Sequence, residues 1–372
     1  MTLGFLYLQD FRNYAHLELE MAPGVSLFFG ENAQGKTNLL EACYYLSTLS
    51  SPRVEREGDL GLWGSQAFCV GGRLDGIGEG PVYVKIETTL NPYLRRRIRV
   101  QNEAAKKPDL VRIFPCVYFS PDDLYTVKKG SSFRRKYLDS LLERIVPGYA
   151  KNLSRYQDVV TRRNAVLKKA SFDSLWKKTL DGLDELFLDT GTSILVSRMA
   201  LVGDLARYIT ETYRFVSSEE CQVEYASSLG ALENQGDKDR INHLFRSRLA
   251  ETKRLEMQRG VTLIGPHRDD LVFSLAGKPV RYFGSQGQQR SVALALRMAE
   301  AKLLEQAFER KPALLLDDVF SELDENRRNK VISLREFGHQ ILLTSTDPVS
   351  YGGYEFQMYR VANNSVVPLG RA

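Results

Sequence analysis

A phosphate-binding loop constrains this chain more than any other feature of its sequence. Residues 30–37 read Gly-Glu-Asn-Ala-Gln-Gly-Lys-Thr, the full G-x-x-x-x-G-K-T pattern. The apolar run Val25–Phe29 before it predicts a short buried strand, and Asn38–Ala42 after it predicts the start of a helix. Strand, loop and helix in that order are the context that this motif needs, and they disfavour a chance glycine-rich turn.

The residue types of the loop explain what it binds. Gly30 and Gly35 let the backbone curl so that successive N–H groups point at an anion, and the next helix adds the positive end of its dipole. Lys36 is placed to contact the β- and γ-phosphates, and the Thr37 hydroxyl to bind Mg²⁺. We expect ATP to contact the whole loop: Gly30, Glu31, Asn32, Ala33, Gln34, Gly35, Lys36 and Thr37.

A second pattern predicts the rest of the magnesium site. Ala313–Leu316 reads as a buried parallel strand that ends at Asp317. Ligands bind at the carboxyl ends of strands in open α/β sheets, so we expect Asp317 to hold Mg²⁺. Asp318 is the candidate to orient or deprotonate a water, which makes Lys36 and Asp318 the catalytic candidates. The alternative is a pair of helix-capping aspartates.

A third pattern lies between these two, at the start of a predicted helix. Residues 285–288 read Ser-Gln-Gly-Gln, and apolar positions recur at helical spacing from Val292 to Leu303. A helix start offers a hydroxyl and bare N–H groups to a phosphate. We therefore take Ser285, Gln286, Gly287 and Gln288 as a second phosphate-contacting element, although such a helix start on its own is usually structural.

Composition narrows the class of protein. The hydrophobic fraction of 43% and the charged fraction of 26% are ordinary for a globular chain. We find no apolar run near the roughly 20 residues of a membrane span, and no secretory signal. The four cysteines have no metal-type spacing and are expected to be reduced thiols, which predicts a cytoplasmic protein without a membrane partner.

Basic residues concentrate in one segment. Residues 128–178 hold 14 Lys or Arg and 4 Asp or Glu, whereas the net charge of the whole chain is +5. This excess predicts an anionic partner, and a solvated helical face is the alternative. For contacts to this partner, which the resemblance given below implies to be double-stranded DNA, we single out Arg134, Arg135, Lys136, Arg162 and Arg163, with Arg95, Arg96 and Arg97 as the next candidates.

The order of secondary structure predicts two lobes. Strand-like alternation dominates residues 1–120 and returns in residues 261–372, whereas residues 121–260 have mostly helical spacing. The phosphate loop and Asp317 must share a sheet to share Mg²⁺. The sequence therefore predicts an α/β fold in which a mostly helical second lobe, residues 121–260, interrupts a head formed by residues 1–120 and 261–372.

These motifs, in this order, resemble the ABC-type ATPases, and within them the RecF family of bacterial recombination mediators. The resemblance covers nearly the whole chain. The most specific segments contain Gly-Pro-His-Arg-Asp-Asp and Ser-Gln-Gly-Gln-Gln-Arg. The matching stretches are Asp10–Tyr14, Gly30–Ala42, Phe119–Pro121, Arg134–Asp139, Ser154–Tyr156, Arg163–Lys168, Gly265–Leu271, Ser285–Arg290 and Leu314–Asp324.

The resemblance implies an ABC-type P-loop ATPase head that dimerises when ATP binds. In such dimers the signature, here Ser285–Gln288, completes the nucleotide site of the partner copy. It further implies binding to duplex and gapped DNA, a role in repair, replication and recombination with RecR, RecO and RecA as partners, and hydrolysis that resets the dimer.

Three features depart from common ABC patterns. Asp318 stands where many relatives have Glu, which indicates slow hydrolysis used as a switch. Ser345-Thr346-Asp347 occupies the place of a frequent His, and no lobe-connecting Gln is evident. Two alternatives stay open: a transporter's nucleotide-binding subunit, and a nucleotide-gated scaffold for protein partners. His267 lies in a turn without a second ligand at metal-binding spacing.

Overall fold

The computed structural model describes residues 1–169, 174–217, 219–232, 237–322, 325–333, 340–348 and 355–371. They form two compact units, one of Met1–Asp123 with Glu300–Ala372 and one of Leu124–Ala299. The sequence placed residues 261–299 with the head. In the structure they pack with the helical residues, because their strands pair with a strand from within the helical segment.

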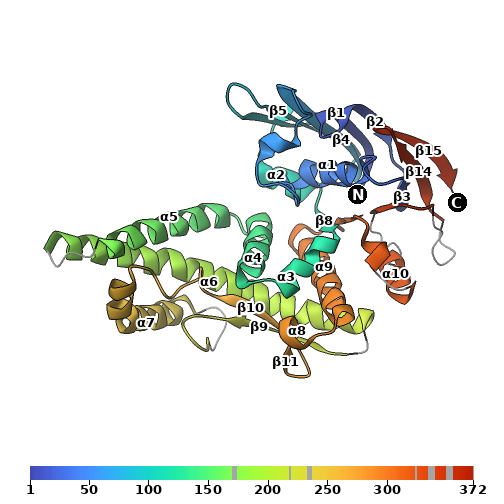
Figure 1. Ribbon diagram of the computed structural model, residues 1–372. Helices are drawn as coiled ribbons and strands as arrows, with labels where there is room; N and C mark the ends of the chain where they lie inside the picture. Colours follow the sequence, from blue (N-terminus) through green and yellow to red (C-terminus); the bar gives the residue numbers. More distant parts are fainter. Residues whose placement is uncertain are drawn as a thin grey trace. The chain divides into compact units, whose positions relative to one another are not determined.

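A mostly parallel sheet forms the centre of the first unit (Figure 1). Its parallel strands are short, buried and almost entirely apolar, as expected for a sheet covered on both faces. In spatial order the strands are β15 (Ser365–Arg371), β14 (Gln357–Ala362), β3 (Val25–Phe29), β13 (Ile341–Ser345), β12 (Ala313–Leu316) and β8 (Cys116–Phe119). Among these described strands, β15 alone pairs antiparallel, with β14.

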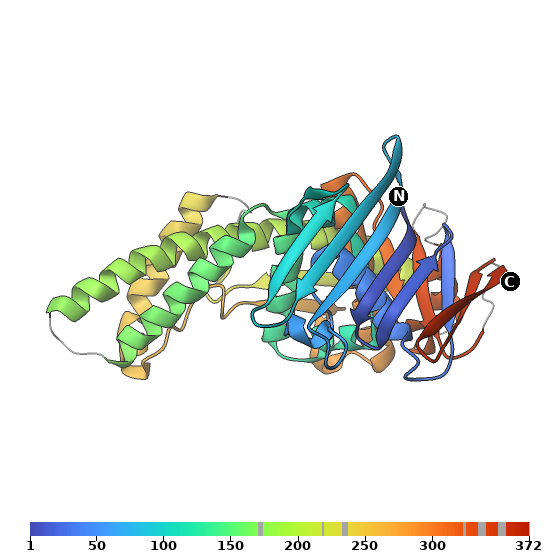
Figure 2. The ribbon, with the colours of Figure 1, turned by 90° about the horizontal axis from the view of Figure 1, so that it is seen from above.

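A second, antiparallel sheet of the same unit is drawn broadside in Figure 2. Helix α1 (Lys36–Thr48) packs against strands of both sheets and is buried on almost every side. One hydrophobic core therefore joins the two sheets through this helix. The antiparallel strands in order are β2 (Tyr14–Glu20), β1 (Thr2–Phe11), β4 (Ala67–Ile77), β5 (Gly80–Thr89), β6 (Arg95–Val100) and β7 (Glu103–Ala104).

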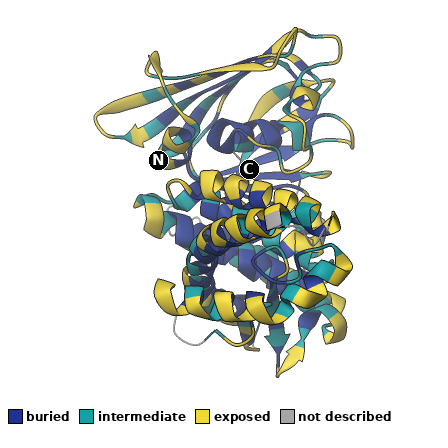
Figure 3. Ribbon diagram, turned by 90° about the vertical axis from the view of Figure 1, so that its left-hand side faces the viewer, coloured by how far each residue is buried: buried dark blue, intermediate teal, exposed yellow. Residues whose placement is uncertain are grey.

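Long helices build the second unit. Helices α5 (Tyr149–Lys168) and α6 (Ser174–Val216) run side by side, and α7 (Lys238–Arg259) packs on both (Figures 1 and 2). Buried residues of α5 recur every three or four positions, so one face of that helix enters the core. Figure 3 shows that the helices in general have buried faces where they meet one another and exposed faces on the outside.

Helix α6 has a property that the sequence did not indicate. Residues Leu175–Val216 form the one described helix that is long and apolar enough, by length and composition alone, to cross a membrane. However, 61% of its apolar window is buried inside the protein, against α5, α7 and the strand β9 (Cys221–Ala226). Its apolar character is therefore accounted for by packing, as for the core helix of a globular protein.

The remaining elements are short, apart from α4 and α9. A three-stranded sheet of β9, β10 (Asp270–Leu275) and β11 (Lys278–Pro279) leads through α8 (Val280–Phe283) to α9 (Gln286–Phe308). The other described elements are η1 (Glu57–Leu60), α2 (Lys107–Ile113), η2 (Pro121–Asp123), α3 (Leu124–Lys128), α4 (Ser131–Ile145), η3 (Val319–Glu322) and α10 (Glu325–Ile332).

Candidate nucleotide site

The phosphate loop has the predicted position between β3 and α1. Gly35 precedes the helix with φ 106°, in a left-handed conformation that favours glycine. A Cβ atom at Gly35 would lie 2.5 Å from Asn13 Nδ2, so no larger residue fits without movement. The strand, the turn and the helix therefore place the loop as the sequence predicted.

Lys36 reaches back over the loop. Its ammonium donates hydrogen bonds to the carbonyl oxygens of Gly30, at 2.5 Å, and Glu31, at 2.7 Å. Burial lowers the pKa of Lys36, and the carboxylates of Asp318 and Asp317 partly oppose that shift. The cation therefore lies at the centre of the loop, close to the two aspartates that follow β12.

Thr37 and Asp317 meet although 280 positions separate them. The Thr37 hydroxyl donates to Asp317 Oδ1 at 2.9 Å, and Thr344 at the end of β13 donates to the same oxygen at 2.9 Å. The Tyr118 hydroxyl at the end of β8 donates to Asp317 Oδ2 at 2.7 Å. Three parallel strands and the start of α1 thus converge on one buried carboxylate.

This donor set fits magnesium. A hydroxyl and a carboxylate are the hard oxygen ligands that Mg²⁺ takes from a protein, which otherwise leaves its sites to water and phosphate. Tyr118 and Thr344 would hold the Asp317 carboxylate in place, as hydrogen-bond partners do for ligating groups. Burial and the nearby Asp317 carboxylate raise the pKa of Tyr118, so its hydroxyl stays protonated and remains a donor.

Asp318 differs from Asp317 in its backbone conformation and in its exposure to solvent. It has φ 51°, its N–H donates to the Thr344 hydroxyl at 2.9 Å, and its side chain is exposed. The turn therefore points the second carboxylate away from the buried one, which a pair of capping aspartates would not require. Leu323 and Asp324, the end of the matching segment, lie outside the described residues.

The C-terminal hairpin contacts the phosphate loop, which the sequence did not predict. The turn between β14 and β15 donates from Asn363 N to Gln34 Oε1 at 2.7 Å. Its next residue, Asn364, accepts a hydrogen bond from Asn13 Nδ2 at 2.5 Å. Both turn asparagines have positive φ, typical of a tight hairpin. The Asn-Asn pair signals the turn, but nothing in the sequence indicates what the turn touches.

The predicted signature begins α9 with reciprocal hydrogen bonds. Ser285 N donates to Gln288 Oε1 at 2.9 Å, and Gln288 N donates to Ser285 Oγ at 3.2 Å. This arrangement is a capping box, which fixes the helix start. Gln288 Nε2 also donates to both carboxylate oxygens of Glu219, at 3.0 and 3.2 Å. Ser285 and Gln286 are exposed and Gly287 has space around its Cα, so the helix start is open to a partner.

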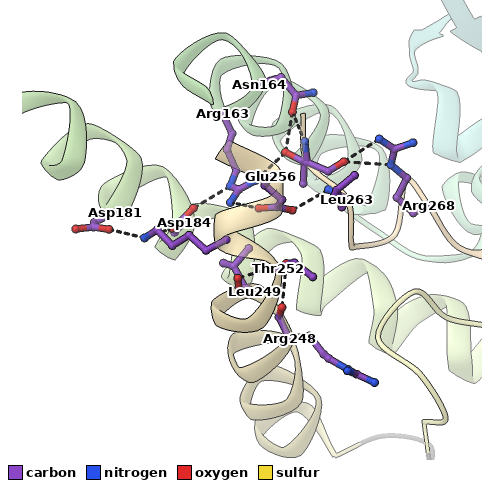
Figure 4. Close-up of polar contacts among 12 residues, drawn as sticks. Arg163, Asn164, Asp181, Asp184, Arg248, Leu249, Thr252, Glu256, Leu263 and Arg268 are labelled. Atoms are coloured by element: carbon purple, nitrogen blue, oxygen red, sulfur yellow. Dashed lines mark hydrogen bonds and ion pairs between the residues drawn. The ribbon is translucent and has the colours of Figure 1, made fainter. Parts of the chain in front are cut away.

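Two of the five residues singled out for DNA contact are not available for it. The Arg163 side chain is fully buried and binds Asp184 at 2.8 Å, Glu256 at 2.6 Å and the Thr262 hydroxyl at 2.8 Å (Figure 4). Arg134 is 3% exposed and binds both carboxylate oxygens of Asp270. We therefore correct the assignment for Arg134 and Arg163: their charges are neutralised inside the second unit.

The other three residues singled out for DNA contact differ in their exposure to solvent. Arg135 is half-buried and donates to the carbonyl of Asp269 at 2.8 Å. Lys136 is exposed, and Arg162 is exposed and paired with Asp158 one helical turn away. Lys136 and Arg162 lie on different helices, α4 and α5, and remain candidates for contact with an anion.

The segment from Gly265 to Asp270 is the junction of a buried polar network. Asp269 accepts hydrogen bonds from Ser228 and from the Tyr225 hydroxyl, and His267 Nδ1 shares a hydrogen bond of 2.6 Å with the Tyr156 hydroxyl. Arg198 donates to the Pro266 carbonyl at 2.7 Å. The segment thus ties α5, α6 and β9 to the start of β10, which agrees with a structural turn.

Comparison with known proteins decides the family. The model for the RecF/RecN/SMC N terminal domain matches residues 2–364. A "DNA replication and repair protein RecF" of Moorella thermoacetica is 36% identical over 93% of this chain and 90% of its own length. The chain belongs to the RecF family. A protein of the same name from Natranaerobius thermophilus is 33% identical over 99% of this chain and 98% of its own.

Solved structures agree with that membership. A structure described as the recombination mediator protein RecF with ATP in the RecFOR pathway superposes with a TM-score of 0.87, at 30% identity over 99% of this chain and 97% of that one. An SMC head bound to a ScpA domain superposes with a TM-score of 0.56 at 14% identity, which shows a shared fold alone. The fold is therefore the ABC-type ATPase head of the RecF and SMC proteins.

Proposed function

We propose that this protein is an ATP-dependent DNA-binding protein of DNA repair, replication and recombination. One observation carries the nucleotide part of the proposal: Thr37 and Asp317, 280 positions apart, lie within 2.9 Å of each other beside the Lys36 ammonium. The names of the relatives, and the similar RecF structure with ATP, support the same conclusion.

Each residue of the site has a role in holding ATP with Mg²⁺. The loop N–H groups and Lys36 would bind the phosphates, and Thr37 and Asp317 would hold the metal ion, which neutralises charge on the phosphates. The exposed Asp318 carboxylate follows the buried one directly and is the candidate to orient a water. Ser345, next to Gly30 through a backbone hydrogen bond of 3.3 Å, is an uncharged neighbour of the phosphate end.

The signature at the start of α9 is the reason for proposing a dimer. The open start of α9 offers the Ser285 hydroxyl and neighbouring N–H groups, which suit a phosphate held by a second copy. ATP that binds the dimer more tightly than the monomer must, by linkage, favour dimerisation, and hydrolysis must relax it. A pair of copies would then bind duplex DNA near single-strand gaps, with RecR as the expected direct protein partner and with RecO and RecA acting indirectly.

Lys36→Ala tests this proposal. Removing the cation at the centre of the loop leaves the phosphates without their fixed positive charge, so ATP affinity should fall at least tenfold, as expected for a lost charge-assisted contact of roughly 1.5–3 kcal/mol. Binding of a fluorescent ATP analogue measures this. In gel shifts, the parent should bind a short duplex more tightly with ATP, and the variant should not respond to ATP.

Lys238→Ala is the matched control, because it removes an exposed lysine at the start of α7, in the second unit and outside the nucleotide site. Equal ATP affinity in Lys36→Ala and parent would refute the nucleotide site. Parent protein that binds ATP but no DNA would instead favour the scaffold alternative.

A further inference from the structure

A carboxylate that the proposed function does not use holds the signature at the start of α9. Glu219, just before β9, accepts two hydrogen bonds from Gln288 Nε2, at 3.0 and 3.2 Å. The hydroxyl of Tyr213, on α6, donates to the same carboxylate at 3.3 Å. Gln288 in turn closes the capping box with Ser285. One exposed carboxylate therefore occupies the amide donor of the residue that fixes the signature.

The negative charge of Glu219 is not neutralised where it lies. Within the part of the chain that the structure describes, Glu219 has no ion pair, whereas the next residue, Glu220, pairs with Arg214. Under the proposed function, the helix start beside Glu219 receives the phosphates of a second copy. A carboxylate and a phosphate repel each other and compete for the same donors, so Glu219 opposes the approach of that phosphate.

A hollow beside Glu219 offers its side chain a second position. The hollow has a volume of about 420 Å³ and is lined by both Glu219 and Lys278. Leu275 of β10 pairs with Cys221 on one side and with Lys278 on the other, so Lys278 lies about 10 Å across the sheet from the start of β9. Lys278 is exposed, and its ammonium has no ion pair with a described residue. A carboxylate released from Gln288 would find a cation across the hollow.

We propose that the contact between Glu219 and Gln288 is autoinhibitory and limits the pairing of two copies. In a single copy, Glu219 binds Gln288 and its charge repels ATP held by another copy. When two ATP-bound copies meet, the phosphate takes the donors at the start of α9 and Glu219 moves to Lys278. Both arrangements satisfy the carboxylate, so the side chain has two discrete positions whose balance the partner's ATP shifts.

This inference rests on the proposed function, because it names the residue that regulates the ATP-dependent pairing of copies. Glu219, Lys278 and Gln288 all belong to the second unit, so the autoinhibitory contact is complete within one copy. The alternative is that Glu219 only positions Gln288 for the incoming phosphate. The two roles predict opposite signs: loss of an inhibitory charge strengthens pairing, whereas loss of a positioning group weakens it.

Glu219→Gln tests the sign. The amide keeps the size of the side chain and still offers an oxygen to Gln288, but it removes the charge. The dissociation constant of the ATP-bound dimer should fall by at least about fivefold. Sedimentation velocity over a series of protein concentrations, with Mg²⁺ and a non-hydrolysable ATP analogue, measures it. The matched control is Glu220→Gln, which removes the same charge from the next residue and should change the constant by less than about twofold.

Lys278→Ala tests the second position of the carboxylate. Without this ammonium the released Glu219 has no cation to receive it, so pairing should weaken. In the Glu219→Gln background the same substitution should have no further effect, because the two residues act as one coupled pair. A lysine that contacts the partner's phosphate directly would instead weaken pairing equally in both backgrounds.

Three results would overturn the autoinhibitory contact. They are a Glu219→Gln dimer no tighter than the parent's, equal tightening by Glu220→Gln, and an effect of Lys278→Ala that is the same in both backgrounds. If the parent dimerises with the ATP analogue while any of these is observed, the proposed function stands and this inference fails. A parent that stays monomeric with the analogue would refute ATP-dependent pairing itself, and this inference with it.

Discussion

At the scale of single residues, position in the fold decides what a charge does. Arg162 and Arg163 are neighbours in the sequence, yet one is exposed and the other is sealed among Asp184, Glu256 and Thr262. His267 is a third case, since its imidazole is packed beside the rings of Tyr156 and Phe187. Burial lowers the pKa of His267 to about 4, so it is neutral in the folded protein at neutral pH.

This shift predicts a pH dependence of stability. The unfolded chain protonates His267 near pH 6.5, whereas the folded protein resists protonation until about pH 4. Lowering the pH from 7 to 5 therefore favours unfolding, by about 2 kcal/mol from this residue. Urea unfolding at both pH values measures the change. His267→Gln should reduce the difference between the two pH values, whatever its effect at pH 7, and an equally steep difference in that variant would contradict the assignment.

At the scale of elements, the sequence predicted local structure best where a short motif requires both a particular backbone conformation and a particular side-chain chemistry. The phosphate loop needs Gly35 for its turn and Lys36 for its charge, and the apolar run before Asp317 could only be a buried strand. The meeting of Thr37 with Asp317 then follows because the loop after β3 and the residue after β12 lie at the same edge of one parallel sheet, with β13 between the two strands. The capping box from Ser285 to Gln288 is equally local, so its geometry was accessible from the sequence.

Contacts between residues that are far apart in the sequence could not be predicted from it. The acids that neutralise Arg163 come from α6 and α7, 21 and 93 positions away, and no spacing rule connects them to α5. The same holds for the C-terminal turn that contacts Gln34, 329 positions away. A count of charges along residues 128–178 could therefore find a basic segment, but not which of its arginines are exposed.

The Arg163 network predicts that two adjacent substitutions will change the free energy of unfolding by very different amounts. Arg163→Ala would leave Glu256 buried without its cation, so the free energy of unfolding should fall by about 3–5 kcal/mol. Arg162→Ala removes an exposed pair and should change it by less than about 1 kcal/mol. Urea titration followed by circular dichroism compares them. Similar stability of the two variants would show that the network contributes little.

At the scale of the whole molecule, the described site is half of what an ABC-type head needs. Phosphate loop, Thr37 and Asp317 belong to the first unit, and the capped signature belongs to the second. Helix α9 runs from one unit into the other, with residues 286–299 in the second and 300–308 in the first. A single continuous helix therefore joins the signature to the unit that holds the candidate nucleotide site, so under the proposed function α9 would connect ATP binding to dimerisation.

Two substitutions should separate assembly from hydrolysis. Ser285→Arg places a bulky cation at the open helix start, so the variant should bind ATP yet sediment as a monomer. Asp318→Asn keeps Asp317 and loses the exposed carboxylate that is the candidate to orient a water, so its ATP-bound dimer should persist while the parent's dimer decays as ATP is consumed. Sedimentation velocity with ATP and Mg²⁺, sampled over time, distinguishes the two. A Ser285→Arg protein that dimerises as well as the parent would exclude the signature from the shared site, and an Asp318→Asn dimer that decays at the parent's rate would remove Asp318 from hydrolysis.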